Sequence, residues 1–362
     1  MVRRRIIFHE FNLAYEGKAY LPLVAGQLLA YAWQDPDLRA AYDVAPLFFR
    51  HQAIEQILAA HPPTVDVAAF SVSVWNEQLS LHVSEALRQA HPQALIVFGG
   101  CQVPFDAREY LAVHPWIDLC ARGEGEQTFA AILKARAHGQ DYAKIPGLTV
   151  RTPEGAIVTP DNSQPKELDV YPSPYLGGWY DVLMAAHPEI EWQAIIETNR
   201  GCWAQCAFCF WGNALNAKYR LFSVERVSAI FSWLGRHKVK YVFNADSNFG
   251  MLPQDQWILN ALLSTHDAWG YPDKFRTCWG KNTTDKIYTM AKRLHDAGLD
   301  KGLTLSRQSQ DPQTLINVHR SNIRLDVYAA LQRRANADGV PVYSELILGM
   351  PGETEESWER GL

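Results

Sequence analysis

Three closely spaced cysteines carry the clearest chemical signal in this sequence. Cys202, Cys206 and Cys209 follow the spacing C-x3-C-x2-C within "NRGCWAQCAFCFWG", residues 199–212, in a chain of 362 residues that has six cysteines. Thiolates bind soft metals, and a structural zinc site is one interpretation. Zinc usually takes four protein ligands, whereas the next cysteine in the chain is Cys278. An iron–sulfur cluster with three protein ligands and one open iron fits the motif better.

The motif resembles the signature of the radical S-adenosylmethionine superfamily, in which an aromatic residue precedes the last cysteine. That residue is Phe208 here. The resemblance implies a 4Fe-4S cluster held by Cys202, Cys206 and Cys209, with S-adenosylmethionine chelated to the open iron. One electron from the cluster would cleave the sulfonium to methionine and a 5′-deoxyadenosyl radical, while the protein positions the cofactors and excludes water. It also implies an electron donor of the flavodoxin or ferredoxin type.

Three later segments resemble parts of the same family that contact S-adenosylmethionine. "NAD" at 244–246 stands where the family usually has Gly-Gly-Glu for the methionine amino group, so Asp246 could replace the glutamate. "TLSRQS" resembles the ribose segment, and "ELILGMPGET" resembles the adenine segment, where glycines allow close approach. Ordinary polar strand ends or helix caps remain the alternative for each. The expected contacts are Phe208, Asn244, Asp246, Ser306, Gln308, Gly349 and Gly352.

The first 140 residues alternate apolar runs with helical patterns, which is typical of a parallel α/β sheet. Strands are expected at 4–10, 45–49, 66–74, 94–100 and 117–126, and helices at 21–33, 52–61, 77–91 and 127–137. This order predicts a flavodoxin-like, doubly wound parallel sheet. Such sheets bind ligands at the carboxyl ends of their strands, which places 71–76, 99–104 and 123–125 on one rim.

The rim segments "FSVSVWN", "VFGGCQVP" and "ARGEGEQTF" resemble the cobalamin-binding domain of the cobalamin-dependent radical S-adenosylmethionine enzymes. The connector "SPYLGGWYDVL" followed by "IIETNRGC" is similar to that class as well. A flavin, a nucleotide or purely structural turns remain open as alternatives. The resemblance implies cobalamin contacts at Ser71, Ser73, Trp75, Asn76, Gly99, Gly100, Val103, Gly123 and Glu124.

The histidine motif D-x-H-x-x-G, which supplies a cobalt ligand in cobalamin domains of the methionine synthase type, does not occur in the sequence. His9 ends the first expected strand but lacks the flanking Asp and Gly. We therefore expect no histidine ligand from that motif, and we expect the lower face of the cobalamin to meet Val74, Trp75 and Asn76.

A second series of strands and helices follows a hairpin at 147–160 and a proline-rich linker at 161–178. Its strands are expected at 192–199, 240–246, 275–282, 301–309 and 340–350. The expected division is a cobalamin-binding domain at 1–140, hairpin and linker at 141–190, and a radical S-adenosylmethionine domain at 191–362. We expect the latter to be a partial (β/α)6-type barrel that is apparently truncated, because the class usually continues through a sixth unit and a further domain.

Composition narrows the possible partners. A net charge of −5 with interspersed signs offers no basic stripe for nucleic acid. No apolar run approaches the length of a membrane span, and the start "MVRRRIIFHEFN" is too briefly apolar for a signal peptide. Six cysteines in a chain of this size do not form a disulfide framework, so we expect a cytoplasmic protein.

The resemblance implies methylation of an unactivated carbon in a small-molecule or peptide natural product. The 5′-deoxyadenosyl radical would abstract a hydrogen atom, and methylcobalamin would deliver the methyl group. One alternative keeps both cofactors for cyclisation or rearrangement. Another is a non-catalytic cobalamin or iron–sulfur binding protein. No catalytic residue is assigned at this point.

Overall fold

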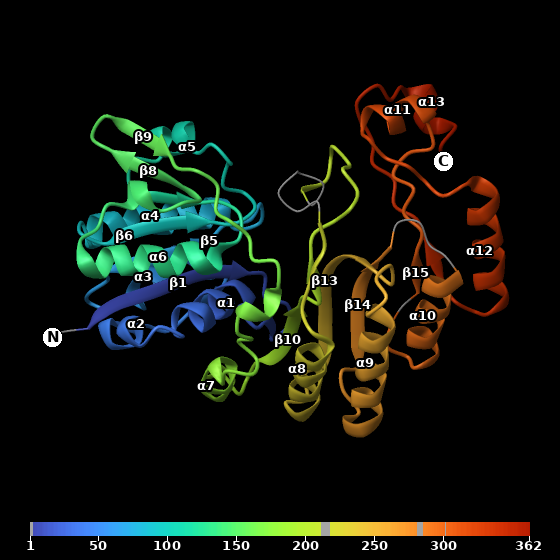
Figure 1. Cartoon of the computed structure of the whole chain (residues 1–362), viewed down its shortest axis with the longest axis horizontal. Helices are drawn as coiled ribbons and strands as arrows, with labels where there is room; N and C mark the ends of the chain where they lie inside the picture. Colours follow the sequence, from blue (N-terminus) through green and yellow to red (C-terminus); the bar gives the residue numbers. More distant parts are fainter. Residues whose placement is uncertain (1–2, 211–217, 281–284, 301) are drawn as a thin grey trace. The chain divides into compact units, whose positions relative to one another are not determined.

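The computed structural model of the chain describes residues 3–210, 218–280, 285–300 and 302–362 (Figure 1). These residues divide into two compact units. Unit 1 comprises Met1–Pro165 and Val170–Trp192, and unit 2 comprises Lys166–Asp169 and Gln193–Leu362. Unit 1 therefore continues beyond residue 140, where the sequence placed the end of the first domain.

The sheet of unit 1 has the strand order β3-β1-β5-β6-β7-β8-β9, with β4 also paired to β1. The pairs from β3 and β4 to β7 are parallel, as in the expected flavodoxin-like order. The strands are β1 (Arg4–Asn12), β3 (Tyr42–Val44), β4 (Phe48–Arg50), β5 (Val67–Ser71), β6 (Leu95–Gly99), β7 (Leu119–Ala121), β8 (Leu148–Thr152) and β9 (Gly155–Val158). A further strand of the chain is β2 (Lys18–Tyr20).

Hydrophobic cores lie on both faces of this sheet, because successive residues of a strand point to opposite sides. Ile6 and Phe8 of β1 belong to one core, and Ile7 belongs to the other. The helices of the unit are α1 (Leu23–Ala32), α2 (Pro36–Ala41), α3 (Ile54–Ala59), α4 (Glu77–Ala90), α5 (Arg108–Val113), α6 (Gly125–His138) and α7 (Trp179–Ala186), with a short 3-10 turn η1 (Tyr142–Lys144); a second one, η2 (Leu168–Val170), lies where the chain passes from unit 2 back to unit 1.

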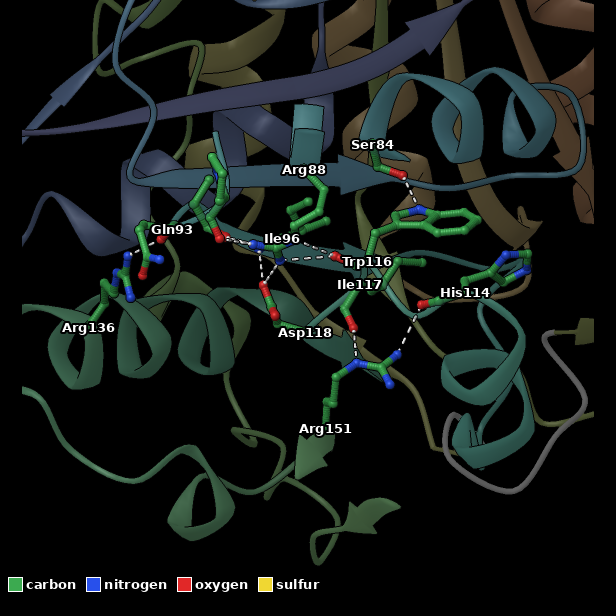
Figure 2. Close-up of polar contacts among 12 residues, drawn as sticks. Ser84, Arg88, Gln93, Ile96, His114, Trp116, Ile117, Asp118, Arg136 and Arg151 are labelled. Carbon is green, nitrogen blue, oxygen red and sulfur yellow. Dashed lines mark hydrogen bonds and ion pairs between the residues drawn. The ribbon is translucent and has the colours of Figure 1, made fainter. Parts of the chain in front are cut away.

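A polar network fixes the amino ends of β6 and β7 (Figure 2). Asp118, just before β7, accepts the backbone N–H of Ile96 at 2.8 Å and pairs with Arg88 of α4 at 2.5 Å. Arg88 also donates to the backbone oxygen of Trp116, whose indole donates to Ser84 at 2.9 Å. These bonds set the relative position of the two strands from one end. The loops expected to bind cobalamin leave the opposite end.

The hairpin β8–β9 extends the sheet of unit 1, with β8 antiparallel to β7 and β9 antiparallel to β8. Arg122, directly after β7, donates to the backbone oxygen of Leu148 at 2.8 Å and pairs with Asp161 at 3.0 Å. The region 141–190, expected to hold only a hairpin and a linker, also contains η2 and α7. The helices α2 and α5 were not predicted either.

Unit 2 contains the parallel strands β10 (Glu191–Ile196), β13 (Tyr241–Phe249) and β14 (Lys274–Trp279), in the order β10-β13-β14. A second parallel pair is β15 (Leu303–Thr304) with β16 (Val342–Tyr343), and β11 (Asn199–Arg200) pairs antiparallel with β12 (Arg220–Leu221). The helices are α8 (Val224–Arg236), α9 (Asp255–Trp269), α10 (Asp285–Asp296), α11 (Pro312–Asn317), α12 (Leu325–Ala337) and α13 (Glu355–Glu359). This alternation is the expected partial barrel, and Figure 1 shows β10, β13, β14 and β15 following one another in chain order.

Some expected strands of unit 2 differ in length from those of the structure. β13 runs three residues beyond its expected end at 246, whereas β15 and β16 have two residues each. Residues 281, 282 and 301 of the expected strands lie outside the described residues. Within the described part of the chain, every helix is too short or too polar to cross a lipid bilayer.

Candidate cofactor sites

The three cysteines lie on a loop that follows β10 and β11, as the sequence predicted for their context. Cys202 and Cys206 are buried, and Cys209 is half-buried. The backbone N–H of Cys209 donates to the backbone oxygen of Cys206 at 3.0 Å, which turns the second half of the motif back on itself. Phe208 keeps 38% of its surface exposed, so its ring is available to a ligand beside the loop.

The three thiols supply a soft donor set on a short segment, which suits an iron–sulfur cluster. Across residues 3–210, 218–280, 285–300 and 302–362, no three Cys, His, Asp or Glu side chains gather as a metal site requires. The chemistry and burial of the thiols fit the cluster, and their assignment as cluster ligands stays a prediction.

Side chains near the end of β13 form hydrogen bonds to the segment that leads into the cysteine loop. The buried carboxylate of Asp246 accepts the backbone N–H groups of Thr198 at 2.8 Å and Asn199 at 3.2 Å, together with the Thr198 hydroxyl. Asn244 donates to the same carboxylate at 3.0 Å. Burial raises the pKa of Asp246 to about 6. Asn244 and Asp246, expected to contact S-adenosylmethionine, are thus engaged with the protein itself.

Two further residues of β13 contact the loop directly, and the sequence analysis did not single them out. The Ser247 hydroxyl donates to the backbone oxygen of Gly201 at 2.7 Å. The side-chain amide of Asn248 donates to the sulfur of Cys202 at 3.2 Å. The signal that could have found them is the polar run "NADSN" at the end of an otherwise apolar strand.

Ser306 and Gln308 are brought together beyond the ends of β15 and β16. Both donate to Glu345, at 2.6 Å from the Ser306 hydroxyl and 3.4 Å from the Gln308 amide. The sequence analysis quoted Glu345 within a family segment but gave it no role. These three side chains form one polar cluster, and contact with a ribose stays a prediction for Ser306 and Gln308.

Gly349 and Gly352 both adopt left-handed backbone conformations, with φ of +80° and +83°. The N–H of Gly349 donates to Glu353 at 3.1 Å. A Cβ on Gly352 would lie 2.4 Å from the amide nitrogen of Asn317. The two glycines therefore shape a turn against α11. Their proposed closeness to adenine stays a prediction.

The candidate cobalamin residues of unit 1 leave the carboxyl ends of adjacent strands. Ser71 of β5 is paired with Gly99 of β6, and Gly99 is paired with Ala121 of β7, so all three end in one row. The loop after β6 lies directly against the loop after β5, because a Cβ on Gly100 would be 2.4 Å from the backbone oxygen of Val72. The rim expected from the strand order is therefore present.

Asn76 shapes the first loop of this rim. Its side chain is buried, accepts the N–H of Ser73 at 2.8 Å and donates to the backbone oxygens of Ser71 at 3.0 Å and Phe11 at 3.1 Å. This leaves Val74 76% exposed and Trp75 53% exposed. Asn76 thus acts on the loop backbone, while its two neighbours offer apolar surface to a ligand.

The other two loops carry the remaining candidates. Val103 is buried beneath the second loop, whereas Phe105, which the sequence analysis missed, is 48% exposed. Gly123 has φ of +73°, and Glu124 precedes the first turn of α6 and lies 3.5 Å from the Tyr171 hydroxyl. Exposed apolar side chains beside small residues suit a large, flat ligand such as a corrin ring.

His9 is a packed core residue. Its ring stacks on Phe70 at 4.1 Å and on Phe48 at 5.1 Å between centroids, and its Nε2 lies 3.0 Å from Nε2 of His61. Burial holds the pKa of His9 well below its usual value and lowers the pKa of His61 to about 4, so both rings are neutral near pH 7.

Comparison with known proteins supports a cobalamin site in unit 1. Residues 24–133 match the B12 binding domain family. The chain is 39% identical over 347 residues to 2-(S-pantetheinyl)-carbapenam-3-carboxylate methyltransferase of Streptantibioticus cattleyicolor, and 38% identical over 346 residues to the cobalamin-dependent radical SAM methyltransferase TokK of Streptomyces tokunonensis. Each alignment covers 95% of this chain and 51% of the relative, so the chain spans about half the length of these curated relatives.

Solved structures share the fold. The radical S-adenosylmethionine methyltransferase TsrM of Kitasatospora setae, solved with cobalamin and a [4Fe-4S] cluster, superposes with a TM-score of 0.72 at 17% identity, over 98% of this chain and 69% of that chain. The cobalamin-dependent S-adenosylmethionine radical enzyme OxsB, solved with aqua-cobalamin, gives 0.73 at 16% identity, over 99% and 51%. By sequence, residues 24–133 thus match a B12-binding domain and the chain is similar to cobalamin-dependent radical S-adenosylmethionine methyltransferases, and it shares the fold of solved structures of that kind.

Proposed function

We propose that this chain acts in the methylation of an unactivated carbon, with cobalamin on unit 1 and a 4Fe-4S cluster with S-adenosylmethionine on unit 2. The observation that carries the proposal is the combination of a B12 binding domain at 24–133 with the C-x3-C-x2-C loop. This chain is also 38% identical over 346 residues to a protein named as a cobalamin-dependent radical SAM methyltransferase.

The chemistry supplied by the bound groups would be a carbon-centred radical on the substrate and a transferable methyl group. The residues of the chain prepare that chemistry. Cys202, Cys206 and Cys209 would hold the cluster, and Asp246 holds the backbone that enters their loop. On unit 1, Asn76 and Gly100 set the loops so that apolar surface faces a ligand.

For the substrate, we propose a small natural product. The relative at 39% identity is named for a carbapenam carboxylate, and this supports a compact, functionalised small molecule over a larger polymer. Named cyclases of magnesium-protoporphyrin monomethyl ester match at 29% identity or less, so cyclisation has weaker support. A reducing cytoplasm and a flavodoxin or ferredoxin as electron donor complete the proposal.

The first test measures the iron, sulfide and cobalt content of anaerobically reconstituted protein. A variant with Cys202, Cys206 and Cys209 all changed to Ala serves as the matched control, since it leaves unit 1 untouched. We expect about four irons and one cobalt per native chain, with loss of iron alone in the variant. Zinc in place of iron, or no bound cobalt, would refute the two-cofactor assignment.

Product analysis separates methylation from the alternatives. Incubation with S-adenosylmethionine, a reductant and candidate small carboxylates should yield a product heavier by one methyl group in place of one hydrogen. An isomerised product of unchanged mass would indicate rearrangement instead. Cofactor binding without formation of any 5′-deoxyadenosine would favour a non-catalytic binding protein.

A further inference from the structure

The buried side chain of Asn248 lies against the first cysteine of the motif. Asn248 is 1% exposed, near the end of β13, and its amide nitrogen is 3.2 Å from the sulfur of Cys202. The same nitrogen is 3.1 Å from the hydroxyl oxygens of Tyr219 and Ser247. The contact between the amide and the sulfur joins positions 46 residues apart in the chain, so it depends on the fold of unit 2.

Two of the three groups around the amide, the Ser247 hydroxyl and the Cys202 sulfur, favour its nitrogen end facing the sulfur, whereas the Tyr219 hydroxyl can pair with either end. The Ser247 hydroxyl gives its hydrogen to the backbone oxygen of Gly201, so its oxygen can only accept from Asn248. A cysteine thiolate is also an acceptor. The opposite orientation would place the carbonyl oxygen of Asn248 against both acceptors. The observed orientation leaves that buried oxygen without a hydrogen-bond partner among the described residues.

We propose that Asn248 is a positioning residue that donates a hydrogen bond to the Cys202 thiolate and thereby raises the reduction potential of the cluster. This inference rests on the proposed function, because it requires a cluster on the cysteines. Hydrogen bonds to cluster sulfurs favour the reduced form, which carries the additional negative charge. Partners of metal ligands also fix the ligand's orientation. Asn248 would thus help set how readily the donor delivers an electron.

The test is a redox titration of the reconstituted full chain, followed by electron paramagnetic resonance of the reduced cluster, without S-adenosylmethionine. Asn248→Leu keeps a similar size and removes the donor. At a fixed applied potential, we expect a roughly threefold to tenfold lower ratio of reduced to oxidised cluster in this variant. Gln254→Leu is the matched control, because it removes another side-chain amide, 3.4 Å from the backbone oxygen of Thr198 before the cysteine loop, that makes no hydrogen bond to Asn248 or to a sulfur among the described residues. We expect its midpoint to match that of the native protein.

The outcomes separate this inference from the proposed function. If the native protein forms no 4Fe-4S cluster, the proposed function fails and the inference falls with it. If the native protein and Asn248→Leu hold equal iron but have the same midpoint potential, only the inference is overturned. The same holds if Gln254→Leu shifts the midpoint as much as Asn248→Leu does.

A second measurement covers the case in which Asn248→Leu does not retain iron. Native protein labelled with nitrogen-15 in the asparagine side chains should show that nitrogen coupled to the reduced cluster in pulsed electron paramagnetic resonance. A spectrum without this coupling would overturn the hydrogen bond directly.

Discussion

Substitution of Gly100 tests whether the loops after β5 and β6 lie in close contact at the rim of unit 1. It has φ of +113°, and a Cβ at this position would lie 2.4 Å from the oxygen and 2.8 Å from the nitrogen of Val72. Gly100→Ala therefore combines left-handed strain of about 1–2 kcal/mol with overpacking of about 1–3 kcal/mol. We expect the free energy of unfolding of unit 1 to fall by roughly 2–5 kcal/mol.

Two neighbouring glycines of the same rim serve as controls. A Cβ on Gly99 would meet only Ala121, at an ordinary 3.7 Å, so Gly99→Ala should change the free energy of unfolding by less than about 1 kcal/mol. Gly123 has φ of +73° and nothing within 4 Å of a Cβ, so Gly123→Ala should show the backbone strain alone, about 1–2 kcal/mol.

The assay is urea unfolding followed by circular dichroism, with hydrogen exchange of peptides covering β5 and β6 to localise the effect. The expected order of destabilisation is Gly100→Ala, then Gly123→Ala, then Gly99→Ala. Cobalamin binding, followed by visible absorbance, should weaken most for Gly100→Ala. Equal stability of Gly100→Ala and Gly99→Ala would refute the close contact between the two loops.

Three other acidic side chains give predictions of different kinds. Burial raises the pKa of Glu10 from 4.5 to about 7, so the folded protein keeps this proton up to a higher pH than the unfolded chain does. Relative to Glu10→Gln, the free energy of unfolding of the native protein should fall by on the order of 3 kcal/mol as pH rises from 4.5 to 7. Urea unfolding at each pH measures this, and parallel pH curves for the two proteins would contradict it. Asp118→Ala removes the partner of Arg88 and of a strand N–H and should lower the free energy of unfolding by about 1–3 kcal/mol, with unchanged stability counting against the network. Asp246→Asn places an N–H donor against the backbone N–H of Thr198, which is also a donor, so the cysteine loop should lose support. A chelator should then remove iron about tenfold faster or more, while cobalamin binding is retained. Equal rates of iron loss would show that the carboxylate does not stabilise the loop.

The parallel sheet of unit 1 was predictable because its strands are buried on both faces and read as short apolar runs. The expected third strand ran to residue 74, whereas β5 ends at Ser71. The chain turns there because Asn76 binds the loop backbone, an interaction between residues whose types alone also permit a strand. The hairpin was correctly expected, but its pairing with β7 was not, because pairing depends on partners far along the chain.

The cysteine motif was recognisable because its three cysteines lie close together in the sequence. Its supports were not, since Asp246 and Asn248 reach the loop from a strand that follows more than 30 residues later. Asp246 was expected at a ligand, which stays a prediction, and its support of the loop through backbone N–H groups was not expected. The type of a single polar residue in a strand does not predict which group its side chain will contact.

The hairpin β8–β9 has a consequence for how unit 1 avoids self-association. Without it, β7 would be the outer strand of a parallel sheet and would present unpaired N–H and C=O groups to other molecules. The hairpin replaces this edge with β9, which has four residues and lies between Pro153 and Pro160. A strand so short, flanked by residues that cannot extend the ladder, is a poor template for a second copy. The hairpin thus protects a sheet of slowly formed, long-range pairings from aggregation while the chain folds.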